Sequence, residues 1–111
     1  MGSALQTELR AALHAAGDPD RAVAQRAYMK SALPYAGVAM PEVRRLARRI
    51  GRSHPFGTRA ELESAMRQVW DDAEVREERY AVIEVTGLPP YTAWQEPSLL
   101  PLYQHLIVTG A

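Results

Sequence analysis

Cysteine is absent from this chain of 111 residues. The absence excludes a disulfide framework, thiolate-bound zinc, iron–sulfur clusters and any cysteine nucleophile, and it fits an intracellular protein. No apolar run approaches the roughly 20 residues that a membrane-spanning helix needs. The N-terminus also lacks a basic stretch followed by an apolar one, which is the pattern of a secretory signal. We therefore expect a cytoplasmic protein with no membrane association.

Signals for β-strands are equally scarce. No segment of four or more residues alternates cleanly between apolar and polar side chains, and the hairpin dipeptides Asn-Gly and Asp-Gly do not occur. A hydrophobic content of 47% with 23% charged residues argues against disorder. A chain of this length builds one modest core. The sequence therefore predicts a single all-α domain over residues 1–111.

Apolar spacing, capping residues and helix breakers predict about six helices. Pro19 and Pro41 stand where first helical turns begin. Gly17, Pro34 and Gly87 end the preceding segments. The predicted helices cover approximately 3–16, 19–32, 41–52, 58–72, 74–86 and 97–108. Short loops favour antiparallel pairs, whose length fits the HEAT repeat period, but self-similarity is faint, so the period alone leaves a stacked solenoid and a compact bundle open.

The helix predicted at 41–52 has two unlike faces. At roughly 100° per residue, its apolar residues fall on one side: Val43, Leu46, Ala47 and Ile50. The other side carries Arg44, Arg45, Arg48, Arg49 and Arg52. Arginine makes planar, bidentate contacts to phosphate, and Glu42 is the one acid within this segment. Two interpretations stay open: a solvated helix face and a phosphate-binding surface.

The charges are unevenly distributed along the chain. The whole sequence has a formal net charge of zero, with 13 basic and 13 acidic residues. Residues 1–60 hold ten basic and four acidic groups, which gives +6, and residues 61–111 hold three basic and nine acidic groups, which gives −6. This asymmetry points to an anionic partner for the first half.

Other chemistry-bearing residues are few. Tyr28 and Lys30 precede a connection to the arginine-rich helix, and a tyrosine beside basic groups can lie against a base or sugar. On spacing alone, packing in the core is the favoured interpretation of Tyr28. We likewise expect Trp70 in the core. The acids Asp71, Asp72 and Glu74 fit the solvated junction of two helices, not a catalytic pair. The three histidines have no metal-ligand spacing, so we expect no metal and no cofactor: His14, His54 and His105.

Several of these segments resemble the DNA alkylation repair enzyme family, the AlkD-like DNA glycosylases built from HEAT-like repeats. The resemblance rests on Tyr-Met-Lys at 28–30 followed by Gly-Val-Ala-Met-Pro-Glu-Val-Arg-Arg-Leu at 37–46. It extends through residues 62–72 and 99–109, and thus over most of the chain. One departure is Met40, where the family often has a threonine that can cap the helix.

The resemblance implies an α-solenoid of stacked antiparallel helix pairs that binds alkylated double-stranded DNA. Tyr28 and Lys30 would contact the DNA or the lesion, and the five arginines would contact phosphates. The implied reaction is hydrolysis of the N-glycosidic bond of N3- or N7-alkylated purines, without full extrusion of the base. The alternative is a non-catalytic helical-repeat module for an acidic protein or RNA.

The family's active-site segment has no counterpart in this chain. In the family, the helix matching 99–108 is followed by a Trp-Trp-Asp run, whose carboxylate stabilises the oxocarbenium-like sugar as the base leaves. This sequence ends at Ala111. We therefore expect the N-terminal part of a longer family fold, with no catalytic residue, no glycosylase activity of its own, and self-association through uncapped C-terminal helices.

Overall fold

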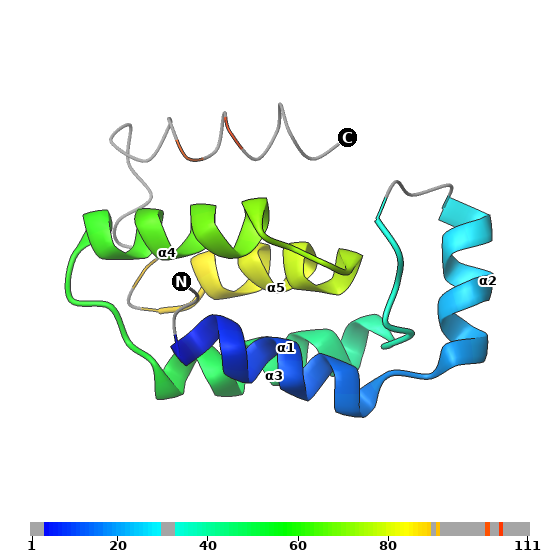
Figure 1. Ribbon diagram of the computed structural model, residues 1–111. Helices are drawn as coiled ribbons and strands as arrows, with labels where there is room; N and C mark the ends of the chain where they lie inside the picture. Colours follow the sequence, from blue (N-terminus) through cyan, green and yellow to red (C-terminus); the bar gives the residue numbers. More distant parts are fainter. Residues whose placement is uncertain (1–3, 30–32, 90, 92–101, 103–104, 106–111) are drawn as a thin grey trace.

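The computed structural model describes residues 4–29, 33–89, 91, 102 and 105. These residues form five helices and no strand, which confirms the all-α prediction (Figure 1). The helices are α1 (Ala4–Ala16), α2 (Pro19–Met29), α3 (Met40–Ser53), α4 (Arg59–Asp71) and α5 (Arg76–Thr86). The sixth predicted helix and the C-terminal self-association surface lie outside the described residues, apart from Leu102 and His105, which are both helical.

Four of the five helices share one core. α3 packs against α5 and α1, and α4 packs against the other side of α5 (Figure 1). The predicted apolar stripe of α3 is buried, and Trp70 lies in the core as predicted, with 4% of its surface exposed. Each of these four helices contributes apolar residues to one continuous cluster, which includes Leu5, Leu9, Leu13, Val43, Leu46, Ile50, Leu62, Met66, Val69, Val82 and Val85. This layered order fits a fragment of helical repeats.

α2 stands apart from the other helices (Figure 1). None of its described side chains is buried, and Val23 and Tyr28 are 73% and 86% exposed. Asp18 starts the helix, because its Oδ1 accepts hydrogen bonds from the backbone N–H groups of Asp20 and Arg21 at 2.9 and 3.3 Å. α2 is therefore positioned by its connections to the rest of the chain and not by core packing.

The base of α2 is fixed by a close backbone contact. The N–H of Asp18 donates to the carbonyl of Gly37 at 3.0 Å. Gly37 has a φ of +87°, and a Cβ atom there would stand 1.9 Å from the carbonyl oxygen of Asp18. Only glycine fits this position without displacing the backbone.

Two adjacent buried carboxylates hold the loops between helices. Glu77 is 0% exposed, and its two oxygens accept hydrogen bonds from the backbone N–H groups of Ala36, Gly37 and Val38 at 2.9 to 3.0 Å. These bonds join α5 to the loop that leads into α3. Because buried charged groups are stable only when paired or hydrogen-bonded, the loop and the carboxylate stabilise each other.

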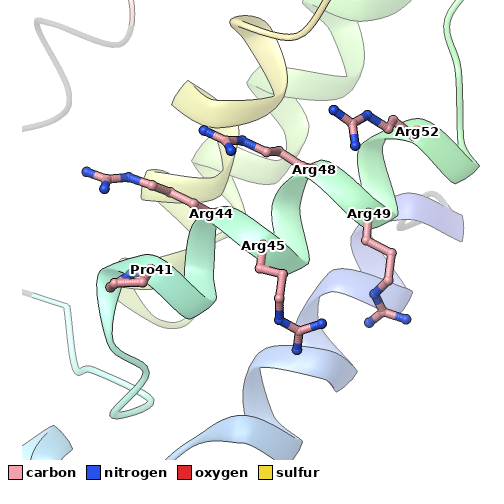
Figure 2. A pocket seen from close by; sticks show the side chains of 6 residues that line it. All are labelled: Pro41, Arg44, Arg45, Arg48, Arg49 and Arg52. Carbon is pink, nitrogen blue, oxygen red and sulfur yellow. The ribbon is translucent and has the colours of Figure 1, made fainter.

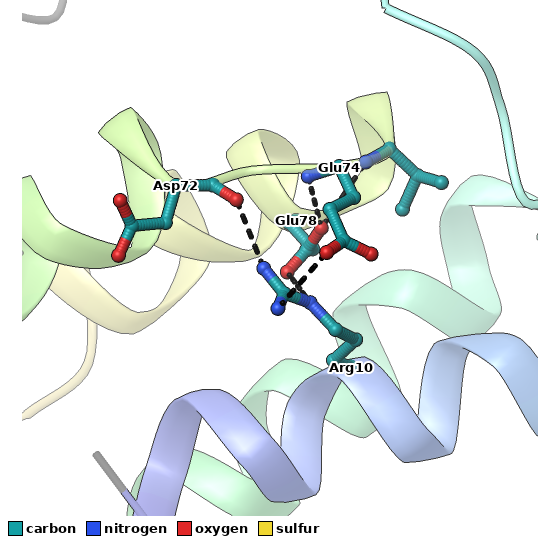
Figure 3. Close-up of polar contacts among 5 residues, drawn as sticks. Arg10, Asp72, Glu74 and Glu78 are labelled. Carbon is teal, nitrogen blue, oxygen red and sulfur yellow. Dashed lines mark hydrogen bonds and ion pairs between the residues drawn. The ribbon is translucent and has the colours of Figure 1, made fainter. Parts of the chain in front are cut away.

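Glu78 performs a similar function at the other side of α5. Its Oε1 accepts from Nε of Arg10 at 3.0 Å, and its Oε2 accepts from the backbone N–H groups of Glu74 and Val75 (Figure 3). Arg10 also donates to the carbonyl oxygen of Asp72 at 2.9 Å. α5 begins at Arg76, two residues after the predicted start, since Glu78 caps the turn that precedes it.

Candidate nucleic-acid interface

The five arginines predicted on one face of α3 do share a surface. Together with Pro41 they line an open hollow of about 760 Å³, and all five side chains are exposed. They stand in two rows along the helix (Figure 2). We call this surface the arginine face: Arg44, Arg48 and Arg52 form one row, and Arg45 and Arg49 form the other. Successive arginines within a row are four residues apart, which is about 6 Å along the helix axis.

The arginines point to solvent because the apolar residues on the opposite side of α3 pack in the core. Val43, Ala47 and Ile50 are each 0–1% exposed, so the helix cannot rotate without exposing apolar surface. Pro41 stands in the first turn, where its missing N–H costs nothing. The orientation of the arginine face is therefore set by packing.

Two acids contact the arginine face. Glu84 of α5 lies 3.3 Å from Arg44 and 3.6 Å from Arg48, and Glu42 accepts a 2.9 Å hydrogen bond from Nε of Arg45. That bond holds the pKa of the Glu42 carboxyl below its ordinary value.

The surface keeps a positive excess in spite of these acids. Arg49 and Arg52 form no ion pair within the described part of the chain. Five positive and two negative charges leave a net charge of +3 on this face. Such a surface attracts anions, and the free guanidinium groups are available for bidentate contacts.

A second hollow lies beside the C-terminal half of α2. It measures about 560 Å³, and we call it the tyrosine pocket. Its lining comes from α2, from the loop before α3, from the first residue of α3 and from α5: Ala24, Gln25, Tyr28, Tyr35, Val38, Met40 and Tyr80. The favoured interpretation of Tyr28 as a core residue is wrong, because α2 does not join the core and the side chain is 86% exposed. Lys30 lies outside the described residues.

The inner wall of the tyrosine pocket is a pair of rings. The hydroxyl oxygens of Tyr35 and Tyr80 are 3.0 Å apart, and the ring centroids are 6.4 Å apart with a tilt of 50°. Burial, followed by the hydrogen bond to Tyr80, raises the pKa of Tyr35 from 10.0 to about 12. The guanidinium of Arg76 lies 5.6 Å from the centroid of the Tyr80 ring. Because its pKa is raised, Tyr35 keeps its hydroxyl proton at neutral pH.

Comparison with known proteins identifies the family. The family model described as DNA alkylation repair enzyme matches residues 9–111, which is nearly the whole chain. The chain belongs to this family. Its role is therefore in DNA alkylation repair. No curated protein sequence matches the chain. The matched range includes both the arginine face and the tyrosine pocket of this DNA alkylation repair family member.

The other polar residues singled out from the sequence of this family member line neither hollow. Asp71 and Asp72 are exposed at the end of α4, as predicted, and Asp71 lies 2.6 Å from Nε2 of His105. His54 contacts Glu8 across the α3–α1 packing. Within the described ranges no three acids or histidines form a metal-binding group. No helix among these residues is long and apolar enough to cross a membrane.

Sequence reasoning missed three residues near the candidate interface. Glu84 borders the arginine face, and Tyr35 and Tyr80 form the inner wall of the tyrosine pocket. A weak signal was present for two of them, because Tyr80 and Glu84 are four residues apart and so share a face of α5. The partner of that face, the start of α3, becomes visible only in the folded chain.

Proposed function

We propose that this DNA alkylation repair family member binds double-stranded DNA through the arginine face of α3. In this proposal it is the DNA-holding portion of a glycosylase that hydrolyses the N-glycosidic bond of N3- or N7-alkylated purines. The observation that carries the proposal is that one rigidly packed helix presents five exposed arginines along one hollow. Contacts from Tyr28 and Lys30 to the DNA are part of the same proposal and come from the family resemblance.

Phosphate contact explains this surface better than recognition of base edges. Guanidinium groups in two rows match a line of phosphates, whereas base reading needs side chains inserted into a groove. Each phosphate neutralised releases counterions, so the affinity falls steeply with salt. The arginine face accordingly supplies affinity and register to the complex, and little sequence preference.

The arginine face is suited to hold DNA and not to cleave the glycosidic bond. As the alkylated base leaves, positive charge develops on the sugar, and a nearby negative charge lowers that barrier. Guanidinium groups would raise it. The two acids at this surface, Glu42 and Glu84, are already paired with arginines. We therefore assign the bond-breaking group to a position away from this surface.

Fluorescence anisotropy with a labelled DNA duplex tests the proposal. With three to five phosphate contacts, log affinity should fall against log salt with a slope of roughly −3 to −4.5. The double variant Arg49→Ala/Arg52→Ala should lose about two units of that slope, because these arginines have no internal acid to satisfy. The matched control is Arg59→Ala/Arg67→Ala, which removes the same charge from α4.

Two results would contradict the proposal. Equal losses for the α3 and α4 variants would mean that net charge, and not this surface, determines binding. Equal affinity for duplex RNA or for an acidic polypeptide would favour the non-catalytic helical-repeat module instead.

A further inference from the structure

A chain of hydrogen bonds runs from the core to the first turn of α2. We propose that Glu77 and Asp18, which lie at its two ends, are positioning residues for DNA binding: they set the direction in which α2 presents Tyr28. The inference rests on the contact of Tyr28 with DNA in the proposed function, and it adds the residues on which that contact depends.

One planar peptide group links the two acids. It joins Gly37 to Val38, and its N–H donates to Glu77 at 3.0 Å while its carbonyl accepts from the N–H of Asp18 at 3.0 Å. Glu77 also accepts from the N–H groups of Ala36 and Gly37, so its buried carboxylate holds three consecutive peptides of this loop. The peptide that receives α2 is therefore fixed from the core side.

Asp18 passes this orientation on to the helix. Its Oδ1 accepts from the N–H groups of Asp20 and Arg21 at 2.9 and 3.3 Å, and its carbonyl accepts from the N–H of Ala22 at 2.9 Å. The first turn of α2 is thus bonded to the same residue whose own N–H is bonded to the loop. Tyr28 lies ten residues further on, about 15 Å along the axis, so a tilt of about 10° at Asp18 displaces it by roughly 2 to 3 Å.

Side-chain packing supplies little alternative support for α2. None of its described side chains is buried, and it stands apart from the other helices (Figure 1). A further polar contact, from Nε2 of Gln25 to the carbonyl of Val38 at 3.5 Å, reaches the same loop. The direction of α2 therefore depends on the loop that Glu77 holds.

That direction matters because Tyr28 borders the arginine face. Tyr28 and Met40 line the tyrosine pocket, and Pro41, the next residue after Met40, lines the arginine hollow. DNA with its phosphates on the arginine face passes close to the end of α2. A displacement of a few ångströms exceeds the tolerance of a hydrogen bond, so it would remove the Tyr28 contact and leave the arginines in place.

A double-mutant cycle with a labelled DNA duplex tests the proposal. We expect Tyr28→Ala and Asp18→Ala each to weaken binding roughly threefold to tenfold, as for the loss of one contact. The double variant should lose less than about twofold more, because both changes remove the same contact. The salt slope set by the arginine face should stay unchanged.

Two further variants separate positioning from charge and from general helix stability. Asp18→Ser removes the same negative charge as Asp18→Ala but keeps a capping oxygen, so it should restore binding to within about twofold of the wild type. Thr58→Ala removes the side-chain cap of α4, which accepts from the N–H of Glu61 at 3.2 Å. It should change affinity by less than about twofold and combine additively with Tyr28→Ala.

Distances between spin labels test the Glu77 end of the chain. Because the sequence has no cysteine, Ala27→Cys on α2 and Ile83→Cys on α5 provide two unique attachment sites, and both positions are exposed. Electron–electron resonance should give a narrow distance distribution in the wild type and a wider one in Glu77→Gln and in Asp18→Ala. Thr58→Ala should leave the distribution narrow. If Glu77→Gln does not fold, Asp18→Ala decides the question.

The outcomes distinguish this inference from the proposed function. Additive losses for Asp18→Ala and Tyr28→Ala, or weak binding by Asp18→Ser, overturn the positioning role while a normal salt slope keeps duplex binding intact. If the wild type binds no duplex, the proposed function fails. The label distances then decide whether Asp18 and Glu77 direct α2, and equal widths in the wild type and Asp18→Ala would overturn that as well.

Discussion

The carboxylate of Glu84 on α5 lies 3.3 Å from the guanidinium of Arg44 on α3. The same carboxylate is 3.6 Å from Arg48, so one acid contacts two members of one row of the arginine face. The acid is half-buried, with 22% of its side chain exposed. A phosphate that binds to these two arginines must therefore compete with an internal anion.

Removing that competitor should strengthen DNA binding. In Glu84→Gln the net charge of the arginine face rises by one. Arg44 and Arg48 lose their ion pairs with Glu84, so both guanidinium groups can bind phosphate. We expect roughly a threefold to tenfold gain in affinity at low salt. The slope of log affinity against log salt should become steeper by up to about one unit, which corresponds to one more phosphate contact. Anisotropy titrations at several salt concentrations measure both quantities.

The matched control for this substitution is Glu63→Gln on α4. Glu63 also pairs with an arginine, Arg67, at 3.5 Å, but neither residue lines the arginine face. Its loss should change affinity by less than about twofold, because distant exposed charges are screened. A gain of the same size in both variants would show that the effect is one of overall charge.

The arginine face itself could be predicted from the sequence, while its electrostatic surroundings could not. The apolar and basic residues of α3 follow the period of a helix, and that period fixes both faces. Glu84 approaches from a helix 40 residues further on in the chain, and no local pattern places it there. Tyr28 was misjudged for a related reason, because its spacing resembles core spacing but α2 joins no core.

The buried acids Glu77 and Glu78 were hidden from sequence reasoning in the same way. Two glutamates in a first helical turn are typical of an exposed helix start that complements the dipole. Glu78 does cap the preceding turn locally, but the distant partners of the two acids are three backbone N–H groups of the loop before α3 and the side chain of Arg10. Tertiary structure brings these donors together, and a single sequence does not reveal them.

Glu77 should be among the most sensitive residues of the fold. Glu77→Leu leaves the N–H groups of Ala36, Gly37 and Val38 buried without their acceptor. We expect a loss of roughly 3 to 5 kcal/mol in the free energy of unfolding. Urea denaturation measures this loss, and the exposed Glu74→Ala, whose side chain is 69% accessible, should lose less than about 1 kcal/mol. Comparable losses in the two variants would refute the anchoring role of Glu77.

Gly37 gives a second test of how the base of α2 is built. Gly37→Ala places a Cβ atom 1.9 Å from the carbonyl oxygen of Asp18 on a backbone with a φ of +87°. We expect a destabilisation of at least about 1 to 3 kcal/mol. Gly57→Ala is the control, since a Cβ atom there meets nothing closer than 3.8 Å. Thermal unfolding of both variants would disprove this account if their midpoints fell equally.

The tyrosine pair predicts a specific loss of stability in alkali. The pKa of Tyr35 is raised from 10.0 to about 12 by burial and by its hydrogen bond to Tyr80. The folded state therefore holds this proton more tightly than the unfolded state does. The resulting stability is fully present below pH 10 and is lost as the pH rises from 10 to about 12.

In Tyr35→Phe the part of the alkaline loss of stability that comes from Tyr35 should disappear. Chemical denaturation across that pH range, alongside the ultraviolet absorbance of tyrosinate, provides the measurement. A wild type and a variant that lose stability in parallel would show that Tyr35 titrates at its ordinary pKa in the folded protein.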